Sequence, residues 1–255
     1  MDDISTPEHQ ESEHKTEQAT TLQQSMAVPI AIVISGALIG ISIWYTGGMG
    51  KTPNQPVQAL KTPPSVDRAR PVDPARDHML GSVSAPVALI EYADLECPYC
   101  KDYHKVVEAT LKSYIASGQV KLVYRHLPLV DIHPKAMDEA IAAVCVSRVS
   151  GNDAFWKYVG RIFAVTPSNN KLDPEKLDTL AIELGVNMDT FSACRANPDV
   201  RTRIEEDTED AIAAGATGTP FTVLIAADGS RFGYSGLMST AQLEERIKAA
   251  LTLRK

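Results

Sequence analysis

The sequence predicts an α/β fold in which a strand–helix–strand unit and a strand–strand–helix unit are separated by a helical insertion. Two apolar, β-branched runs at residues 87–94 and 120–127 flank a helical pattern that begins at Cys97. Two further strand patterns lie within residues 220–234, and an amphipathic helix follows them. Residues from about 130 to 214 carry helical patterning only, which predicts an inserted helical subdomain.

Composition limits the class of protein. The chain has 255 residues, of which 44% are hydrophobic and 22% charged, so it can form one large globular domain with additional segments. A formal net charge of −7 argues against a nucleic-acid binder, because such proteins usually carry a basic face. Four cysteines are too few for a fold of this length to be stabilised mainly by disulfides, and they fit one or two specific pairs.

Three segments are predicted ahead of the folded domain. Residues 1–25 are rich in Glu, Gln, Thr and Ser, which is typical of a disordered tail. Residues 27–45 contain no charge and as a helix would span about 30 Å, so we assign 26–46 to an uncleaved transmembrane signal anchor. The alternatives are a cleaved signal peptide, which lacks a suitable cleavage site here, and a buried core helix. Residues 47–76 contain six prolines and predict an extended linker.

The first folded unit is expected to begin near Asp77. The apolar run at 87–94 predicts a buried strand, and apolar residues at helical spacing between Cys97 and Gly118 predict a helix. The run at 120–127 predicts a second strand. This order implies a parallel pair of strands with a right-handed crossover.

Helix-start patterns divide the insertion. Helices are expected near Pro134 and Asp153, and a third helix should be capped by Asp173. Helical patterning continues over residues 188–214, and we interpret the acidic run at 205–210 as a solvated helix face.

The final unit combines a hairpin with a helix. The Asp228–Gly229 dipeptide predicts a turn between two short strands. Ser239 and Gln242 have the spacing of a capping box, so the last helix should begin there.

The stretch ECPYCKDYH places two cysteines where a strand ends and a helix begins. Unpaired backbone N–H groups and the positive end of the helix dipole lower the pKa of a thiol at this position. Pro98 suits the first helical turn because its missing N–H costs nothing there. Cys97 should therefore be the exposed, attacking sulfur, and Cys100 the shielded, resolving sulfur.

Other uses of this pair are disfavoured. A zinc site needs two more ligands, and Cys145 and Cys194 are each isolated from a second CxxC or a suitably spaced histidine. An inert bridge across so short a loop would remove little entropy from the unfolded chain. We therefore expect a redox-active pair, and we expect neither a metal nor a cofactor.

Three stretches, EYADLECPYCKDYH, VYRHLPLVDIHPKA and GATGTPFTVLI, resemble the DsbA-like membrane-anchored thiol:disulfide oxidoreductases of the thioredoxin-fold superfamily. The resemblance covers about residues 77–255. It implies a thioredoxin-like fold with a helical insertion and an active site on the extracytoplasmic, periplasmic side of the cell membrane. Lys and Arg after the anchor favour the opposite orientation, but large domains translocate largely regardless of flanking charge.

The resemblance also implies roles for individual residues. Cys97 matches the family nucleophile and Cys100 its buried partner, and Pro220 matches a cis-proline that faces them. An extended substrate segment would then pair with the backbone beside this proline. The residues expected to contact substrate are Pro98, Tyr99, Thr219 and Pro220.

Glu91 lies six residues before Cys97 in an otherwise apolar strand. The resemblance implies a buried acid at this position that moves protons to or from the inner cysteine, and burial would raise its pKa. The alternative is a glutamate on the exposed face of the strand. His126 and His133 also match the family pattern, and we expect them to pack or to start a helix rather than to catalyse.

Cys145 and Cys194 remain after the redox pair is assigned. Either they are small buried apolar side chains, or they form a structural disulfide in the helical subdomain. Some members of the resembling family carry a second bridge in this region, and an oxidising compartment favours pairing. We expect the disulfide.

The resulting hypothesis is an oxidase that introduces disulfides into exported proteins through Cys97 and Cys100. Its partners would be unfolded or partly folded exported proteins and a membrane protein that reoxidises the pair. Tyr99 stands where the strongest oxidants of the family have histidine, and Thr219 is a feature also seen in isomerases. A reductase or isomerase is therefore one alternative, and a non-catalytic, membrane-tethered binding or assembly factor is another.

Overall fold

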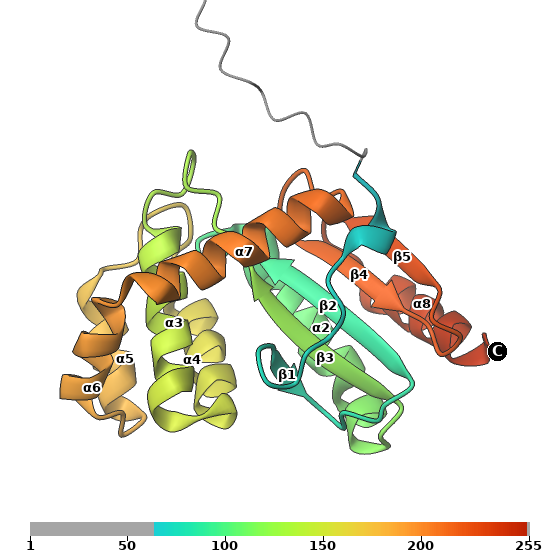
Figure 1. The fold of residues 1–255 in the computed structure, drawn as a ribbon, viewed down its shortest axis with the longest axis horizontal. Coiled ribbons are helices and arrows are strands. Elements are labelled where there is room, and N and C mark those ends of the chain that lie inside the picture. The colour runs from blue at the N-terminus through green and yellow to red at the C-terminus, as the bar shows by residue number, and fades with distance from the viewer. Residues whose placement is uncertain (1–63, 254–255) are drawn as a thin grey trace, which may run out of the picture. The chain divides into compact units, whose positions relative to one another are not determined.

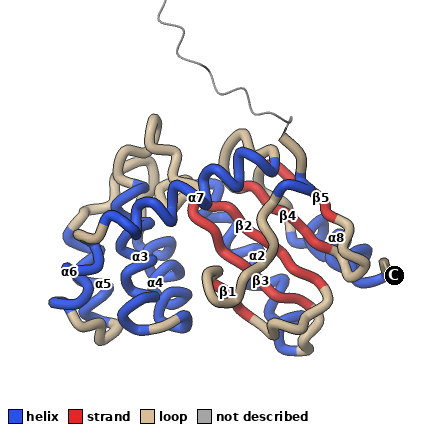
Figure 2. The backbone as a smooth tube through the Cα atoms, viewed as in Figure 1, coloured by secondary structure: helices blue, strands red, loops and turns tan. Residues whose placement is uncertain are grey.

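The computed structural model describes residues 64–253 and contains one five-stranded mixed sheet of order β1-β3-β2-β4-β5 (Figures 1 and 2). The strands are β1 (His78–Leu80), β2 (Val87–Ala93), β3 (Val120–His126), β4 (Phe221–Ile225) and β5 (Arg231–Ser235). β2 and β3 are parallel, and the other neighbouring pairs are antiparallel. The predicted thioredoxin-like order of strands and helices is confirmed.

Helices cover both faces of this sheet. Along β2, Leu89 and Ala93 pack with α2 (Pro98–Ala116) and α8 (Thr240–Thr252) on one face. Ile90 and Tyr92 pack with α7 (Pro198–Ala214) on the other face, where α7 crosses the sheet (Figure 1). The alternation follows from the two-residue period of a strand, which sends successive side chains to opposite faces.

The remaining helices form the insertion beside the sheet (Figure 1). They are α3 (Ala136–Ser150), α4 (Asn152–Val165), α5 (Glu175–Glu183) and α6 (Met188–Arg195). α5 begins one residue later than expected, with Pro174 and not Asp173 as its N-cap, although Asp173 accepts a hydrogen bond from the backbone N–H of Glu175. The capping box of α8 is present, with Ser239 and Gln242 bonded in both directions.

A disulfide joins α3 to α6 inside this insertion. Cys145 and Cys194 are bridged with their Cα atoms 5.7 Å apart and a sequence separation of 49 residues. Closing a loop of this length removes entropy from the unfolded chain that amounts to about 4 kcal/mol. The bridge ties together distant parts of the insertion, and the two sulfurs of the CxxC take no part in it.

The folded domain already includes Ser65, so the boundary predicted near Asp77 is wrong. The backbone N–H of Ser65 donates to the carbonyl of Ala213, a short helix η1 follows at Val66–Arg68, and Ala69 is buried against the sheet. The last part of the predicted linker therefore packs on the domain. The tail at 1–25, the anchor at 26–46 and the rest of the linker lie outside the described residues. Within residues 64–253, no helix has the length and apolarity needed to cross a bilayer.

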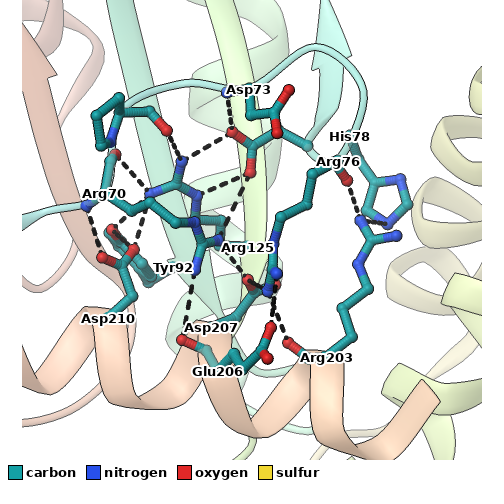
Figure 3. A network of polar contacts seen from close by, with 12 residues as sticks. Arg70, Asp73, Arg76, His78, Tyr92, Arg125, Arg203, Glu206, Asp207 and Asp210 are labelled. Carbon is teal, nitrogen blue, oxygen red and sulfur yellow. Dashed lines mark hydrogen bonds and ion pairs between the residues drawn. The ribbon is translucent and has the colours of Figure 1, made fainter. Parts of the chain in front are cut away.

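The buried side chain of Arg125 explains why residues 65–77 pack on the domain. The guanidinium of Arg125 is fully buried and donates to both oxygens of Asp77 at 2.8 and 2.9 Å and to Asp210 at 2.7 Å (Figure 3). It also donates to the Tyr92 hydroxyl at 3.2 Å and to the backbone carbonyls of residues 70–71, both at 3.0 Å. The N-terminal segment thus supplies acceptors that a buried arginine requires.

The acidic run at 205–210 is only partly a solvated helix face. Asp207 and Asp210 are buried, whereas the expectation placed the whole run in water. Asp207 pairs with Arg70 at 2.7 Å and with Arg76 at 3.3 Å (Figure 3). The helical period places these acids on the side of α7 that faces the N-terminal segment, so they meet arginines more than a hundred residues away in sequence.

Candidate active site

The CxxC pair lies where the carboxyl end of β2 leads into α2. Cys97 is the N-cap residue of α2, with an extended backbone, and Pro98 takes the first helical position. The backbone N–H of Cys97 donates to the carbonyl of Asp94 at 3.2 Å, which closes the turn before the helix. Cys100 sits one helical turn further on and is fully buried.

Cys97 is less accessible than predicted. Only 4% of the residue is exposed, whereas Tyr99 beside it is 65% exposed. The cause is the loop before β4, because the carbonyl oxygen of Thr219 lies 3.6 Å from the Cys97 sulfur. The expectation of an exposed sulfur considered only the helix end and not this distant loop.

The two sulfurs have opposite acidities. The pKa of Cys97 is lowered to about 6, chiefly by a hydrogen bond from the Cys100 thiol, and also by Thr219 and by backbone N–H groups of the first helical turn. The pKa of Cys100 is raised well above its ordinary value by burial and by the neighbouring Cys97 sulfur. At neutral pH the pair is therefore a Cys97 thiolate next to a Cys100 thiol.

The peptide bond between Thr219 and Pro220 is cis. It places the Thr219 backbone beside the sulfurs at the start of β4, which is the placement that the resemblance implied for this pair. The sulfurs, Thr219 and the exposed Tyr99 thus come together from segments that are more than a hundred residues apart.

Asp94 organises the turn that precedes the cysteines. Its carboxylate accepts hydrogen bonds from the backbone N–H groups of Glu96 and Leu129 at 2.7 and 2.8 Å and pairs with His133 Nδ1 at 2.9 Å. Its own N–H donates to the Cys100 sulfur at 3.4 Å. His133 therefore holds a loop in place, and it is bonded to Asp94 and not to a sulfur.

His126 has a packing role, as expected. It is buried with its ring centroid 5.0 Å from that of Tyr124 and 5.9 Å from that of Phe155. Burial, together with the charge of Arg203, lowers its pKa to about 3, so it is neutral at physiological pH.

Glu96 links the CxxC to the helical insertion, and the sequence did not reveal this. Its buried carboxylate accepts from the N–H groups of Asn170 at 2.5 Å and Leu172 at 3.4 Å, and its carbonyl accepts from Asn169 at 2.9 Å. Ser168, Asn169 and Asn170 all have φ near +60°. In this conformation the N–H groups of Asn169 and Asn170 both point at Glu96, one at its carbonyl and the other at its carboxylate. The two adjacent asparagines, which tolerate this conformation, were the available sequence clue.

Glu91 is fully buried on the face of β2 that packs against α2, so the exposed-face alternative is wrong. Neither carboxyl oxygen has a hydrogen-bond partner among residues 64–253. Burial raises the pKa of Glu91 to about 7, and the charge of His104 opposes part of that rise. Glu91 can therefore hold or release a proton near neutral pH.

Glu91→Gln is expected to change how stability depends on pH. The ordinary pKa of 4.5 applies to the unfolded chain and a pKa of about 7 to the folded protein, so the folded protein binds more protons in this interval. The free energy of unfolding should then fall as pH rises from 4.5 to 7, by on the order of 3 kcal/mol.

Urea unfolding at pH 5 and pH 8 tests this expectation. The amide side chain of the Glu91→Gln variant does not titrate. The free energy of unfolding of the variant should therefore not fall by this amount between pH 5 and pH 8, and the variant should be more stable than the native protein at pH 8. A decline of equal size in both proteins would contradict the assignment of a buried, protonated Glu91.

Known proteins share this fold. The family model described as thioredoxin matches residues 74–249. The crystal structure of Wolbachia pipientis α-DsbA1 is 22% identical, with a TM-score of 0.62, over 73% of this chain and 95% of that chain. The crystal structure of Pseudomonas aeruginosa DsbA2 is 27% identical, with a TM-score of 0.57, over 71% of this chain and 96% of that one.

A curated relative has a different name. The Na(+)/H(+) antiporter NhaA 3 of Salinispora tropica is 36% identical over 155 residues, which are 61% of this chain but 22% of the antiporter. The chain thus spans about a fifth of the length of that relative. The thioredoxin match covers most of the described domain and agrees with the sheet order and the CxxC at the start of α2. The chain belongs to the thioredoxin family and has the DsbA-like form of its fold.

Proposed function

We propose that this protein is a thiol:disulfide oxidase that introduces disulfides into exported proteins. The observation that carries the proposal is the contrast between the two sulfurs, a Cys97 with its pKa lowered to about 6 and a buried Cys100 with its pKa raised. Stabilising the reduced thiolate makes a CxxC pair more oxidising. An inert bridge or a binding module has no need of such a contrast.

The reaction proceeds in two exchanges. A substrate thiolate attacks Cys97 of the oxidised pair, the Cys97–Cys100 bond breaks, and Cys100 leaves as a thiolate that takes up a proton. A second substrate thiolate then attacks its own sulfur in the mixed disulfide, and Cys97 leaves as the stabilised thiolate. The substrate loses two electrons and the pair gains them, so a membrane redox partner must reoxidise Cys97 and Cys100.

The substrates are unfolded or partly folded polypeptides in this proposal. The Thr219 backbone beside Pro220 offers an edge for an extended segment, and Pro98 and the exposed Tyr99 flank the sulfur. Residues 26–46 would anchor the protein in the cell membrane with the domain on the extracytoplasmic side. Oxidising chemistry requires a compartment of that kind.

Oxidation of a reduced, unfolded protein with one native disulfide tests the proposal. The full-length oxidised protein, purified in detergent, is mixed with this substrate in the absence of any redox buffer. We expect one substrate disulfide for each Cys97–Cys100 disulfide consumed. Failure to oxidise the substrate, combined with rapid reshuffling of a scrambled substrate by the reduced protein, would favour the isomerase alternative. No reaction of either kind would favour the binding factor.

A further inference from the structure

Cys100 needs a proton each time the Cys97–Cys100 bond breaks. Each turnover leaves a thiolate on Cys100, and both Cys100 and the proton carrier Glu91 are fully buried. The charges of both groups act on the buried Tyr124 hydroxyl, which places them in one part of the core.

A protonated Glu91 can give Cys100 one proton and regain it when the pair is reoxidised. At pH 8 Glu91 is mostly carboxylate, because its pKa is about 7, so the proton that Cys100 takes up must then reach Glu91 from water. A route from the surface to Glu91 is therefore needed at that pH.

One stripe of α2 runs from the buried sulfur to the surface. Cys100, His104 and Glu108 are spaced four residues apart, which places them above one another on the same helix face. His104 is 2% exposed, whereas the side chain of Glu108 is 58% exposed. His104 Nε2 lies 3.5 Å from Glu108 Oε1, so the buried ring reaches an acid that contacts water.

The sheet places Glu91 beneath this part of the helix. Thr222 is paired with Glu91 in the β2–β4 register, and its hydroxyl donates to the Tyr103 hydroxyl at 3.1 Å. Tyr103 directly precedes His104, so the turn of α2 that carries His104 lies over Glu91. Tyr124 is the register partner of Glu91 on β3.

The remaining groups around His104 do not compete for the proton. Burial raises the pKa of Tyr103 and of Tyr124, so both phenols stay neutral. The Phe163 ring of α4 closes the other side, with its centroid 4.9 Å from that of His104. Glu91 from β2, together with Cys100 and Glu108 from α2, are the titratable groups left to exchange protons with the imidazole.

The two ring nitrogens of His104 are buried and make no hydrogen bond within residues 64–253. Nε2 has its 3.5 Å ion-pair contact with Glu108, whereas Nδ1 has no polar contact of that kind in the described part of the chain. Burial lowers the pKa of His104, but the carboxylates of Glu108 and Glu91 raise it by more, so its net shift is upward. A buried polar atom without a hydrogen-bond partner, such as Nδ1 here, requires an explanation, and proton transfer supplies one.

We propose that His104 and Glu108 pass protons between water and Glu91, which exchanges them with Cys100. As the Cys97–Cys100 bond breaks, the Glu91 acid gives its proton to the Cys100 thiolate. The Glu91 carboxylate takes a proton from the His104 imidazolium, and the imidazole regains one from water through Glu108. The net change is one proton moved from water to Cys100. His104 is a positioning residue here because it acts through Glu91, and the inference rests on the proposed oxidase function.

His104→Phe tests this route because it keeps an aromatic ring against Phe163 and removes both nitrogens. The assay is repeated oxidation of dithiothreitol by the full-length protein, with an excess of oxidised glutathione to regenerate the disulfide, between pH 5 and 8. We expect turnover to fall about tenfold at pH 8, which is less than the roughly 10²–10⁴-fold that a direct acid–base catalyst contributes, because His104 acts through Glu91. The deficit should shrink below pH 6, where Glu91 is already protonated in both proteins.

Three controls separate proton transfer from packing. Lys105→Gln changes an exposed side chain on another face of the same helix and should leave turnover unchanged. His104→Ala should be partly rescued by added imidazole, which a packing defect would not be. His104→Gln serves as a second polar variant should the phenylalanine variant fail to fold, and it should show the same pH-dependent deficit. The rate of Cys97 alkylation should not change in any of them.

Two outcomes overturn the route. If His104→Phe and His104→Gln turn over at pH 8 as fast as the native protein, protons reach Glu91 by another path. A loss that is equal at all pH values and is not rescued by imidazole would show that His104 only packs. Failure of the native protein itself to oxidise dithiothreitol would instead count against the proposed function, so the two failures are distinguishable.

Discussion

Cys100→Ser is expected to accumulate mixed disulfides with substrate through Cys97, whereas Cys97→Ser should trap almost none. A pKa of about 6 leaves roughly nine-tenths of Cys97 as thiolate at pH 7, while the pKa of Cys100 is raised by burial. Only Cys97 lies at the helix end beside the Thr219 backbone, where a substrate segment can reach it.

Non-reducing electrophoresis and mass spectrometry of the trapped complexes measure this difference. Both single variants should lose oxidase turnover to the uncatalysed background, because each lacks one half of the redox pair. The Cys145–Cys194 bridge stays intact in both variants and serves as an internal control for folding. Equal trapping by the two variants would mean that the assignment of attacking and resolving sulfurs is wrong.

Arg125→Met is expected to lower the free energy of unfolding by about 3–5 kcal/mol, the usual cost of removing one partner of a buried ion pair. The substitution would remove the buried cation that pairs with both Asp77 and Asp210, and of its ion pairs within residues 64–253 Asp77 would keep only the 3.8 Å contact with Arg70. It would also leave the carbonyls of residues 70–71 without their donor, so the N-terminal segment should detach more readily.

Urea unfolding followed by circular dichroism gives the measurement. Arg161→Ala is the matched control, because Arg161 pairs with Glu183 at the surface and such pairs contribute about 0–1 kcal/mol. Proteolysis should cleave within residues 65–76 sooner in Arg125→Met than in the control. A loss of stability no larger than that of Arg161→Ala would contradict the role assigned to the buried network.

Local patterns predict most of the fold and the two cysteines. β2 and β3 are long enough for their apolar runs to be visible, and α2 and α8 carry both a periodic apolar face and end residues of the expected kind. The role of the CxxC follows from its position between a strand and a helix, which is a local property. β1 has three residues, which is too short for a periodic pattern, so the sequence does not predict it.

Long-range contacts account for what the sequence does not reveal. Residues 65–76 are predicted to be linker because their charges and prolines lack an apolar period, yet Arg70 finds Asp207 across 137 residues. Cys97 is covered by Thr219, which is 122 residues away. A role for His104 in proton transfer can be inferred only when Glu91 is known to lie opposite α2. Without that contact, a lone buried histidine is interpreted as a packing residue.

The redox potential of the Cys97–Cys100 pair tests the central claim most directly. The full-length protein is equilibrated with mixtures of reduced and oxidised glutathione, and the disulfide fraction is measured by alkylation and mass spectrometry. A pair whose thiolate is stabilised as described should titrate as one two-electron couple with a potential well above the roughly −270 mV of thioredoxin, toward about −120 mV. A potential at or below about −270 mV would show a reducing pair and would contradict the oxidase account.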